Sequence, residues 1–186
     1  MSQKKAPRTF LQGAIEGMSK EEFDELVRIV QLSYWRYQEA VIIDGTNDAG
    51  FSKNDGGQGN AYRHALWQAL LTDAFGEDHA KRIGDAHENR VPDDMNVRLF
   101  QGLEDADAMA DMLNNIIGRR IGSDNKGAFN KKMAEHVLEE YRKHGLWSVD
   151  KTRNGYSLQK KNLSVEQYNQ ALQVIQNKGN NGLNIE

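Results

Sequence analysis

The sequence predicts an all-α fold, a compact bundle of about six helices. Apolar residues recur at helical spacing in successive segments, and the chain contains only two prolines, Pro7 and Pro92, which suits long helices. Two capping boxes, at Ser19 with Glu22 and at Ser164 with Gln167, indicate where helices begin. A chain of 186 residues is long enough for one ordinary domain with a hydrophobic core.

The first half of the chain predicts three helices. The first extends over about residues 19–43, where apolar side chains recur at helical spacing. Residues 44–59 are rich in Gly, Asn and Asp, which predicts a loop, and loops of this length often border functional sites. The second helix covers about residues 60–74. Gly76 separates it from the third, over about residues 77–89.

The fourth and fifth helices follow an irregular stretch. The fourth covers about residues 103–120 and stops at Gly122. Ser123 or Asp124 is expected to cap the fifth, and Gly145 to end it. Its apolar stripe consists of Phe129, Met133, Val137, Leu138 and Tyr141.

The C-terminal part predicts a hairpin and a last helix. Apolar residues alternate on both sides of Asn154-Gly155, which indicates a small β-hairpin near residues 147–158. The last helix follows Ser164 and reaches about residue 177. We therefore expect a single helical domain over residues 19–177, after a flexible N-terminal segment of residues 1–18. The remaining residues, 178–186, are expected to form a frayed tail.

Composition and charge exclude several classes of protein. Hydrophobic residues make up 38% and charged residues 27%, typical of a soluble globular chain. The net charge of −3 and the lack of a basic stripe interleaved with aromatics make nucleic acid an unlikely partner. The absence of cysteine excludes thiol nucleophiles, zinc–thiolate sites and disulfides.

The sequence also predicts where the protein is made. No apolar run approaches membrane-spanning length, so no transmembrane segment is expected. No apolar stretch follows the basic N-terminus, so no secretory signal is expected. These features predict a protein that is cytoplasmic as synthesised, with export by a signal-independent system left open.

The fourth helix carries a polar face that suggests a site. Asp107, Asp111, Asn114, Asn115 and Gly118 fall at helical spacing, with Asp111 one turn before Asn115. Asp and Asn are poor residues for a helix interior, because their side chains compete for backbone hydrogen bonds. A face selected only for solvation would favour longer side chains, although solvated faces are the common case.

Histidines on two other helices supply possible metal ligands. The third helix contains His87 and Glu88, and the second contains His64. His87 comes one turn after Ile83, which places it toward the buried side. Imidazole and carboxylate are ligands for zinc, manganese, iron or magnesium, and packed helices can point them at one place. We expect His64, His87, Asp111 and Asn115 to bind a divalent metal ion.

Arginines beside these residues suggest an anionic substrate. Arg63 adjoins His64 in the first turn of a helix, where positive charge is unfavourable, so it should pair with a carboxylate or receive an anion. Arg119 follows the polar face, but a cation near a helix end is favourable in any case. Trp67 is expected to form a wall of the core or of a pocket.

The chain resembles an uncharacterised bacterial domain family with the motif order RHALW, AHE and NNxxGR. Here the corresponding stretches are GNAYRHALWQALL, DAHE and NNIIGRRIG, which together span about a third of the chain. Members of that family often occur in secreted or toxin-like proteins. The resemblance implies a functional set made of Arg63, His64, Trp67, His87, Glu88, Asn114, Asn115, Gly118 and Arg119. It is compatible with a delivered antibacterial effector.

A looser resemblance connects the chain to the HD-domain metal phosphohydrolases. The order of His64, then His87 with Glu88, then Asp111 on a helical scaffold is similar to their pattern. That family has an aspartate where this chain has Glu88. The likeness therefore concerns the chemistry of the site and does not imply a shared function.

The leading hypothesis is a hydrolase that acts on a phosphoester or pyrophosphate through a metal-activated water. A bound metal lowers the pKa of water, and Glu88 would act as general base or as a further ligand. Arg63 and Arg119 would hold the anionic substrate, with Trp67 and Asn114 beside it. For an effector, envelope lipids or their precursors are fitting substrates, and a cognate immunity protein a fitting partner.

Two alternatives remain open at this stage. In the first, no metal takes part, and His87 with Glu88, or His64 with Asp111, serve as acid and base to cleave a glycosidic or lipid ester bond. In the second, the protein is a non-enzymatic helical binding module, whose polar residues form a buried network that fixes helix packing.

Overall fold

A computed structural model describes residues 15, 17–37, 56–88 and 94–185, and only the backbone of residues 34 and 35. Helix α2 (Lys20–Gln31) begins at the predicted capping box and continues into the π-helix η1 (Leu32–Tyr37). Helix α3 (Gln58–Phe75) ends at Gly76, and α4 (Glu77–Glu88) follows directly. The predicted lead-in before residue 15, the end of the first helix and most of the loop over residues 44–59 lie outside the described residues.

The second half contains three more helices and the sheet. Strand β1 (Leu99–Phe100) precedes the long helix α5 (Leu103–Asp124), which is followed by α6 (Asn130–His144). Strands β2 (Leu146–Thr152) and β3 (Gly155–Lys161) form the hairpin, and α7 (Val165–Gln176) begins at the second predicted capping box. The expectation of a mostly helical fold with about six helices and one small hairpin is confirmed.

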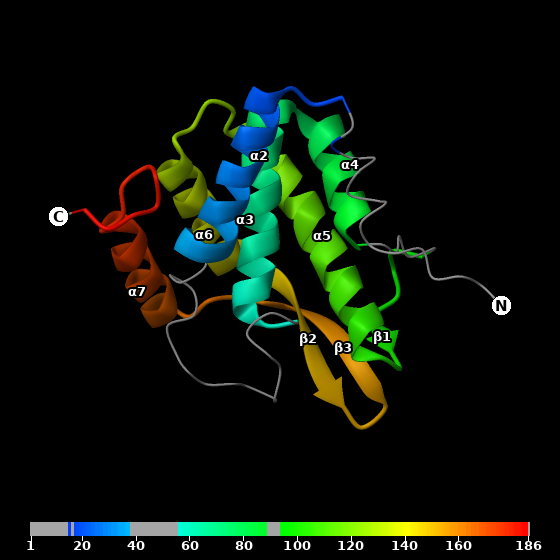
Figure 1. Cartoon of the computed structure of the whole chain (residues 1–186). Coiled ribbons are helices and arrows are strands. Elements are labelled where there is room, and N and C mark those ends of the chain that lie inside the picture. Colours follow the sequence, from blue (N-terminus) through cyan, green and yellow to red (C-terminus); the bar gives the residue numbers. More distant parts are fainter. Residues whose placement is uncertain (1–14, 16, 38–55, 89–93, 186) are drawn as a thin grey trace.

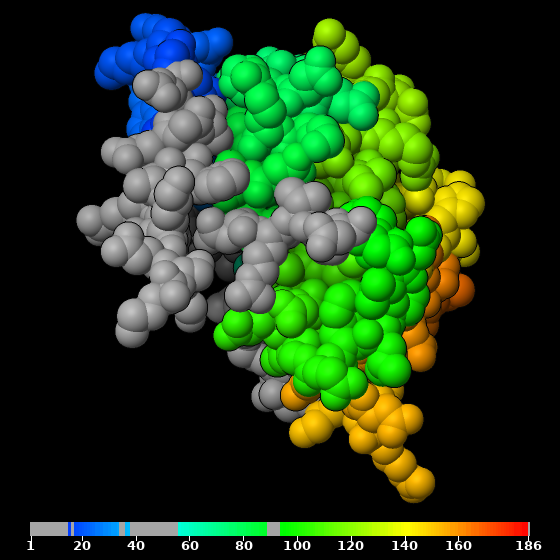
Figure 2. Space-filling view, turned by 90° about the vertical axis from the view of Figure 1, so that its right-hand side faces the viewer, coloured from blue at the N-terminus to red at the C-terminus, as the bar shows by residue number. Residues whose placement is uncertain are grey.

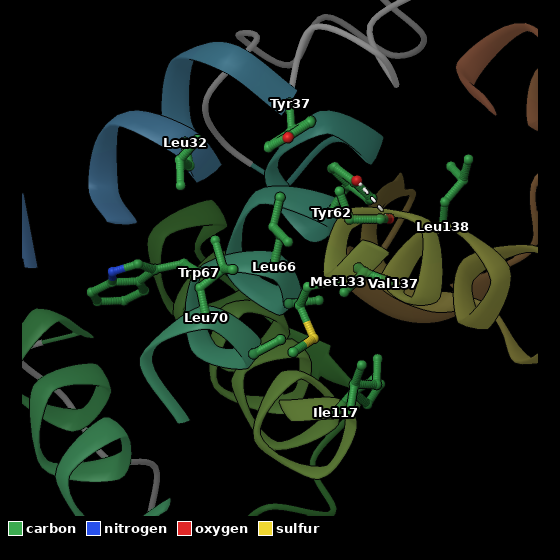
Figure 3. Close-up of a cluster of buried hydrophobic side chains, with 14 of the residues drawn as sticks. Leu32, Tyr37, Tyr62, Leu66, Trp67, Leu70, Ile117, Met133, Val137 and Leu138 are labelled. Atoms are coloured by element: carbon green, nitrogen blue, oxygen red, sulfur yellow. Dashed lines mark hydrogen bonds between the residues drawn. The ribbon is translucent and has the colours of Figure 1, made fainter. Parts of the chain in front are cut away.

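Helix α3 lies at the centre of the bundle and is surrounded by α2, α4, α5 and α6 (Figure 1). All of its residues from Asn60 to Thr72 are buried, so its polar side chains face neighbouring helices and not solvent. On one side, Tyr62 donates its hydroxyl proton to the carbonyl oxygen of Ala134 in α6, at 2.9 Å (Figure 3). Trp67 lies on the opposite side of the cluster from Leu138 (Figure 3). The core therefore forms around α3, with the polar residues of the helix inside it.

Glycines on α5 bring that helix unusually close to α3. A Cβ atom at Gly118 would lie 2.2 Å from the carbonyl oxygen of Ala65, and one at Gly122 would lie 2.4 Å from that of Ala69. No side chain fits there without moving the helices apart, because both neighbours are backbone atoms. Gly118 belongs to the predicted polar face, and in the structure it sets the spacing at which the polar residues of α3 and α5 meet.

The three strands form an antiparallel sheet in the order β1-β3-β2 below the helices (Figure 1). Trp147 pairs with Lys160 and Thr152 with Gly155, so the turn falls one residue earlier than predicted, at residues 153–154. Val149 and Leu158 pack with Ala106, Met109 and Ala110 of α5 in a second, smaller cluster of buried residues. The short strand β1 was not predicted, since two residues give no periodic signal.

The predicted start of the fifth helix is wrong. Ser123 and Asp124 are the last residues of α5, and α6 begins after Phe129, whose side chain makes no capping hydrogen bond. Phe129 is 76% exposed and so does not belong to the apolar stripe of α6. The helix before it extends two residues past Gly122, because that glycine packs against α3 and does not end the helix.

The segment after α7 folds back on the helical body. The Tyr37 hydroxyl donates to the carbonyl oxygen of Gly179 at 2.8 Å. The backbone N–H of Ile185 donates to the carbonyl oxygen of Asn177, also at 2.8 Å. Figure 2 shows the side that carries α4 and the start of α5, with the hairpin turn projecting at the base. Within the described residues, no helix has the length and apolarity needed to cross a membrane.

Candidate metal centre

Two histidines and two carboxyl groups from three helices meet inside the bundle. His64 of α3 lies between the carboxyl groups: its Nδ1 is 3.5 Å from Glu88 Oε1, and its Nε2 is 3.3 Å from Asp111 Oδ2. The ring of His87 has its centroid 5.8 Å from that of His64. The predicted meeting of these groups, which are far apart in the sequence, is confirmed.

Amide side chains hold this cluster in place from both sides. Asn115 Oδ1 lies 3.2 Å from His64 Nδ1. On α3, Asn60 Nδ2 donates to Asp111 Oδ1 at 2.7 Å and to Asp107 Oδ1 at 3.1 Å. The polar face of α5 thus packs against a polar stripe of α3, and most of its hydrogen-bonding atoms face protein and not water.

The carboxyl groups hold their protons far more tightly than in water. Burial, followed by the charge of Asp107, raises the pKa of Glu88 to about 8. The pKa of Asp111 is raised well above its ordinary value by burial and then by the charges of Asp107 and Glu88. Three acidic side chains so close together favour the neutral forms, and a bound cation would favour the charged forms instead.

Both imidazoles are kept neutral. Burial and the charge of Arg63 lower the pKa of His64 well below its ordinary value, and the pKa of His87 is lowered by the same two causes. His87 was expected on the buried side of its helix. The residue as a whole is exposed instead, because it lies in the last turn of α4, but its ring faces Trp67 with the centroids 5.1 Å apart, and this side of the ring is shielded from water. Neutral imidazole is the form that binds metals.

Three of these side chains form a group that can hold a metal ion. His64, His87 and Glu88 each offer one ligand atom, and these atoms lie within 4.8 Å of one another. Ligand atoms at 2.0–2.2 Å from a metal in a tetrahedral site are about 3.3–3.6 Å apart, so movements of about 1 Å would complete the coordination. Two histidines and a glutamate leave a fourth position for water in a tetrahedral site.

The two arginines lie at different levels of the bundle. Arg63 donates to Asn60 Oδ1, and its Nη2 is 3.4 Å from His64 Nε2, so it belongs to the cluster. Arg119 lies one turn further along α5 than Asn115 and donates to Gln68 Oε1 at 3.0 Å. Both arginines are buried.

Asn114 faces the sheet and not the histidines. Its Nδ2 donates to the carbonyl oxygen of Trp147 at 2.9 Å, and its Oδ1 accepts from the N–H of Trp147 at 2.9 Å. The side chain is fully buried and bonds to the β2 backbone as a neighbouring strand would. The predicted contact of Asn114 with substrate stays a prediction, and this structure gives the residue an architectural contact.

Sequence reasoning missed two members of the polar stripe of α3. Asn60 and Gln68 lie four residues before and after His64, and both are fully or almost fully buried. The spacing of Asn60, His64 and Gln68 was itself a usable signal, since three polar residues on one stripe of an otherwise apolar helix need polar partners.

Fold and cluster together define a mostly helical protein with a buried histidine–carboxylate centre that can hold a metal ion. The chain belongs to the DUF6973 family, a domain of unknown function, which it matches over residues 37–145. The match extends from the end of η1 to the residue that ends α6, and so includes the whole centre. No curated protein and no solved structure matched the chain.

Proposed function

We propose that this protein is a metal-dependent hydrolase that acts on an anionic phosphoester or pyrophosphate. The observation that supports this most is the group of His64, His87 and Glu88, whose ligand atoms lie within 4.8 Å of one another. A divalent metal held there would supply Lewis-acid activation of water near neutral pH. With three protein ligands, a fourth position would be left for water, which would suit a catalytic site better than a closed structural one.

The remaining cluster residues would orient the ligands and the substrate. Because His64 Nδ1 faces Glu88, these two residues would hold the cation together, and Asp111, 3.3 Å from Nε2, would then hold the proton on that nitrogen. Asp111 would then be a positioning residue, outside the group of His64, His87 and Glu88 that can hold the metal. Arg63, beside the same ring, would offset the charge that builds on a phosphoryl group.

The exposure of His87 supports a route for substrate. His64 is almost fully buried, whereas His87 reaches solvent at the end of α4. Substrate would therefore approach from this side, past His87 and the Trp67 ring beside it. Arg119, one turn deeper along the bundle, would act on charge at a distance and not by direct contact.

The test combines metal binding and activity. Purified protein is assayed for bound metal and for hydrolysis of a phosphomonoester, a phosphodiester and pyrophosphate, with zinc, manganese or magnesium added. His87→Ala and Glu88→Gln should lose binding and turnover, whereas the control His144→Ala, on an exposed residue at the end of α6, should keep both. The absence of any saturable metal binding to the native protein would refute the proposal.

A metal-free hydrolase is the second candidate, and the pKa of Glu88 supports it. A carboxyl group with a pKa of about 8 is protonated at neutral pH and can serve as a general acid. Hydrolysis of a glycosidic or lipid ester bond that persists in a strong chelator would favour this candidate. Loss of stability in all cluster variants, with no hydrolysis by the native protein, would instead favour a binding module with a structural network.

We also propose that the protein is a delivered antibacterial effector. This role rests on the resemblance to a family whose members occur in toxin-like proteins. Its substrate would be a phosphorylated envelope lipid or precursor, and a cognate immunity protein would protect the producing cell. Expression of the protein in the cytoplasm and, separately, with an added export signal should arrest growth in only the compartment that contains the substrate. A Glu88→Gln variant, which should be harmless in both, is the control.

A further inference from the structure

Two cations converge on one half-buried tryptophan at the edge of the sheet, away from the histidine cluster. The guanidinium carbon of Arg98 lies 4.5 Å from the centre of the Trp147 ring, and the Lys160 ammonium lies 5.7 Å from it. Lys160 is exposed, and Arg98 and Trp147 are half-buried. The ring attracts each cation, but the two cations repel one another.

No carboxylate in the described part of the chain neutralises this pair. Lys161, the next residue along the hairpin, is paired with Asp150, whereas neither Arg98 nor Lys160 makes a salt bridge to a described residue. Arg98 Nη1 donates to the carbonyl oxygens of Met95 and Val97, at 2.7 and 2.8 Å. Among the described residues, the other two guanidinium nitrogens of Arg98 and the indole N–H of Trp147 donate to none, so these donors are available to a ligand.

The Trp147 side chain packs against both the main core and the smaller cluster of buried residues before any ligand arrives, and its backbone is fixed as well. The Asn114 amide bonds to both backbone groups of Trp147, at 2.9 Å each, and cross-strand pairing with Lys160 fixes the register. Arg98 and Trp147 are therefore already in place, and binding would order mainly the exposed Lys160 side chain, which limits the loss of conformational entropy. Because the Arg98 guanidinium already covers the Trp147 ring, stacking of a nucleic-acid base on that ring is disfavoured. A phosphate does not need the face of the ring, since it binds only to the hydrogen-bond donors around it.

We propose that Arg98, Lys160 and Trp147 form a binding site for a phosphate group, either of a soluble phosphate compound or of a lipid headgroup. Guanidinium, ammonium and indole N–H are all donors, and this combination suits the oxygen atoms of a phosphate. The site is separate from the proposed metal centre and does not depend on any hydrolytic activity.

The test follows the indole N–H signal of Trp147 by NMR, assigned with Trp147→Phe, in metal-free protein at physiological salt. Inorganic pyrophosphate should shift this signal saturably. Arg98→Gln and Lys160→Gln should each weaken binding about tenfold, the contribution of one charge-assisted hydrogen bond. The control is Lys151→Gln, an exposed lysine of the same hairpin with no cation–π contact, and it should bind as the native protein does.

Co-sedimentation with vesicles distinguishes the two sources of phosphate. Binding to vesicles of phosphatidylcholine with phosphatidylglycerol, but not to phosphatidylcholine alone, and its loss in Lys160→Gln would assign a lipid headgroup. A pyrophosphate shift without vesicle binding would assign a soluble ligand. The proposal is overturned if neither probe binds the native protein, or if Lys151→Gln weakens binding as much as Lys160→Gln does.

Discussion

Replacement of Gly118 by alanine should push α5 away from α3 and so disturb the histidine cluster. The new Cβ would lie 2.2 Å from the carbonyl oxygen of Ala65, whereas such carbon–oxygen contacts are normally no shorter than about 3.3 Å. The helices must therefore separate by about 1 Å at this level. Overpacking of this kind costs about 1–3 kcal/mol or more, and the better helix propensity of alanine offsets up to about 1 kcal/mol of it.

We therefore expect Gly118→Ala to lower the free energy of unfolding by about 2 kcal/mol. For a chain of this size, that corresponds to a fall in Tm of roughly 4–8 °C. The contact between Asn115 and His64, now 3.2 Å, would lengthen beyond hydrogen-bonding distance. Metal affinity, measured by competition with a chelating dye, should fall as well, because Asp111 of α5, which would orient the His64 ring, moves away from Nε2.

The matched control is Gly84→Ala on α4. Its Cβ would lie 2.8 Å from Gln68 Nε2, the end of a side chain and not backbone, so a shift of the buried Gln68 amide and its bond to Arg119, and not of a whole helix, would make room. This variant should therefore lose less than about 1 kcal/mol, since helix propensity again compensates. If thermal unfolding shows Gly118→Ala to be as stable as Gly84→Ala, the close backbone contact does not set the position of α5 and the reasoning fails.

Three further predictions concern single side chains. In the metal-free folded protein the pKa of Glu88 is about 8, so between pH 4.5 and 8 this residue binds more protons in the folded protein than in the unfolded chain. The stability of the fold therefore falls as the pH rises. From pH 6.5 to 8 the free energy of unfolding should fall by about 2 kcal/mol. Urea unfolding in the presence of a chelator should show that Glu88→Gln removes this fall. The same pH dependence in the variant and the native protein would contradict the raised pKa. Asn114→Ala leaves both backbone groups of Trp147 unsatisfied and should lower the free energy of unfolding in urea by about 1–3 kcal/mol. The metal stoichiometry should not change, and a loss of the metal would instead make Asn114 part of the metal centre. Tyr62→Phe removes one buried hydrogen bond and should cost about 1 kcal/mol, a figure that an unchanged Tm would refute.

Local signals in the sequence predicted most of the fold. Both capping boxes begin helices where expected, and Gly76 and Gly145, each with a positive φ, end α3 and α6. These signals act over one helical turn, so the sequence alone carries them. The start of α6 was missed because Ser123 and Asp124 are good capping residues in isolation, but packing of Gly122 against α3 carries α5 past them.

The chemical character of the centre could also be predicted, but not the direction in which each side chain points. The spacing on α5 placed Asp111 and Asn115 on one face, and both contact His64 as expected. The adjacent Asn114 faces the sheet instead, because neighbouring helical residues point about 100° apart and β2 packs on that side. Which face of α5 meets α3 and which meets the sheet depends on how the helices and strands pack.

By itself, the sequence determined the helices, their caps and the residue types able to bind a cation, because these depend on neighbours within a turn or two. Only the tertiary structure decided that α3 is buried on all sides and that α5 approaches it closely enough for His64 to lie between Glu88 and Asp111. The raised pKa values of the two carboxyl groups follow from that packing, since burial and charge proximity are properties of the folded chain alone.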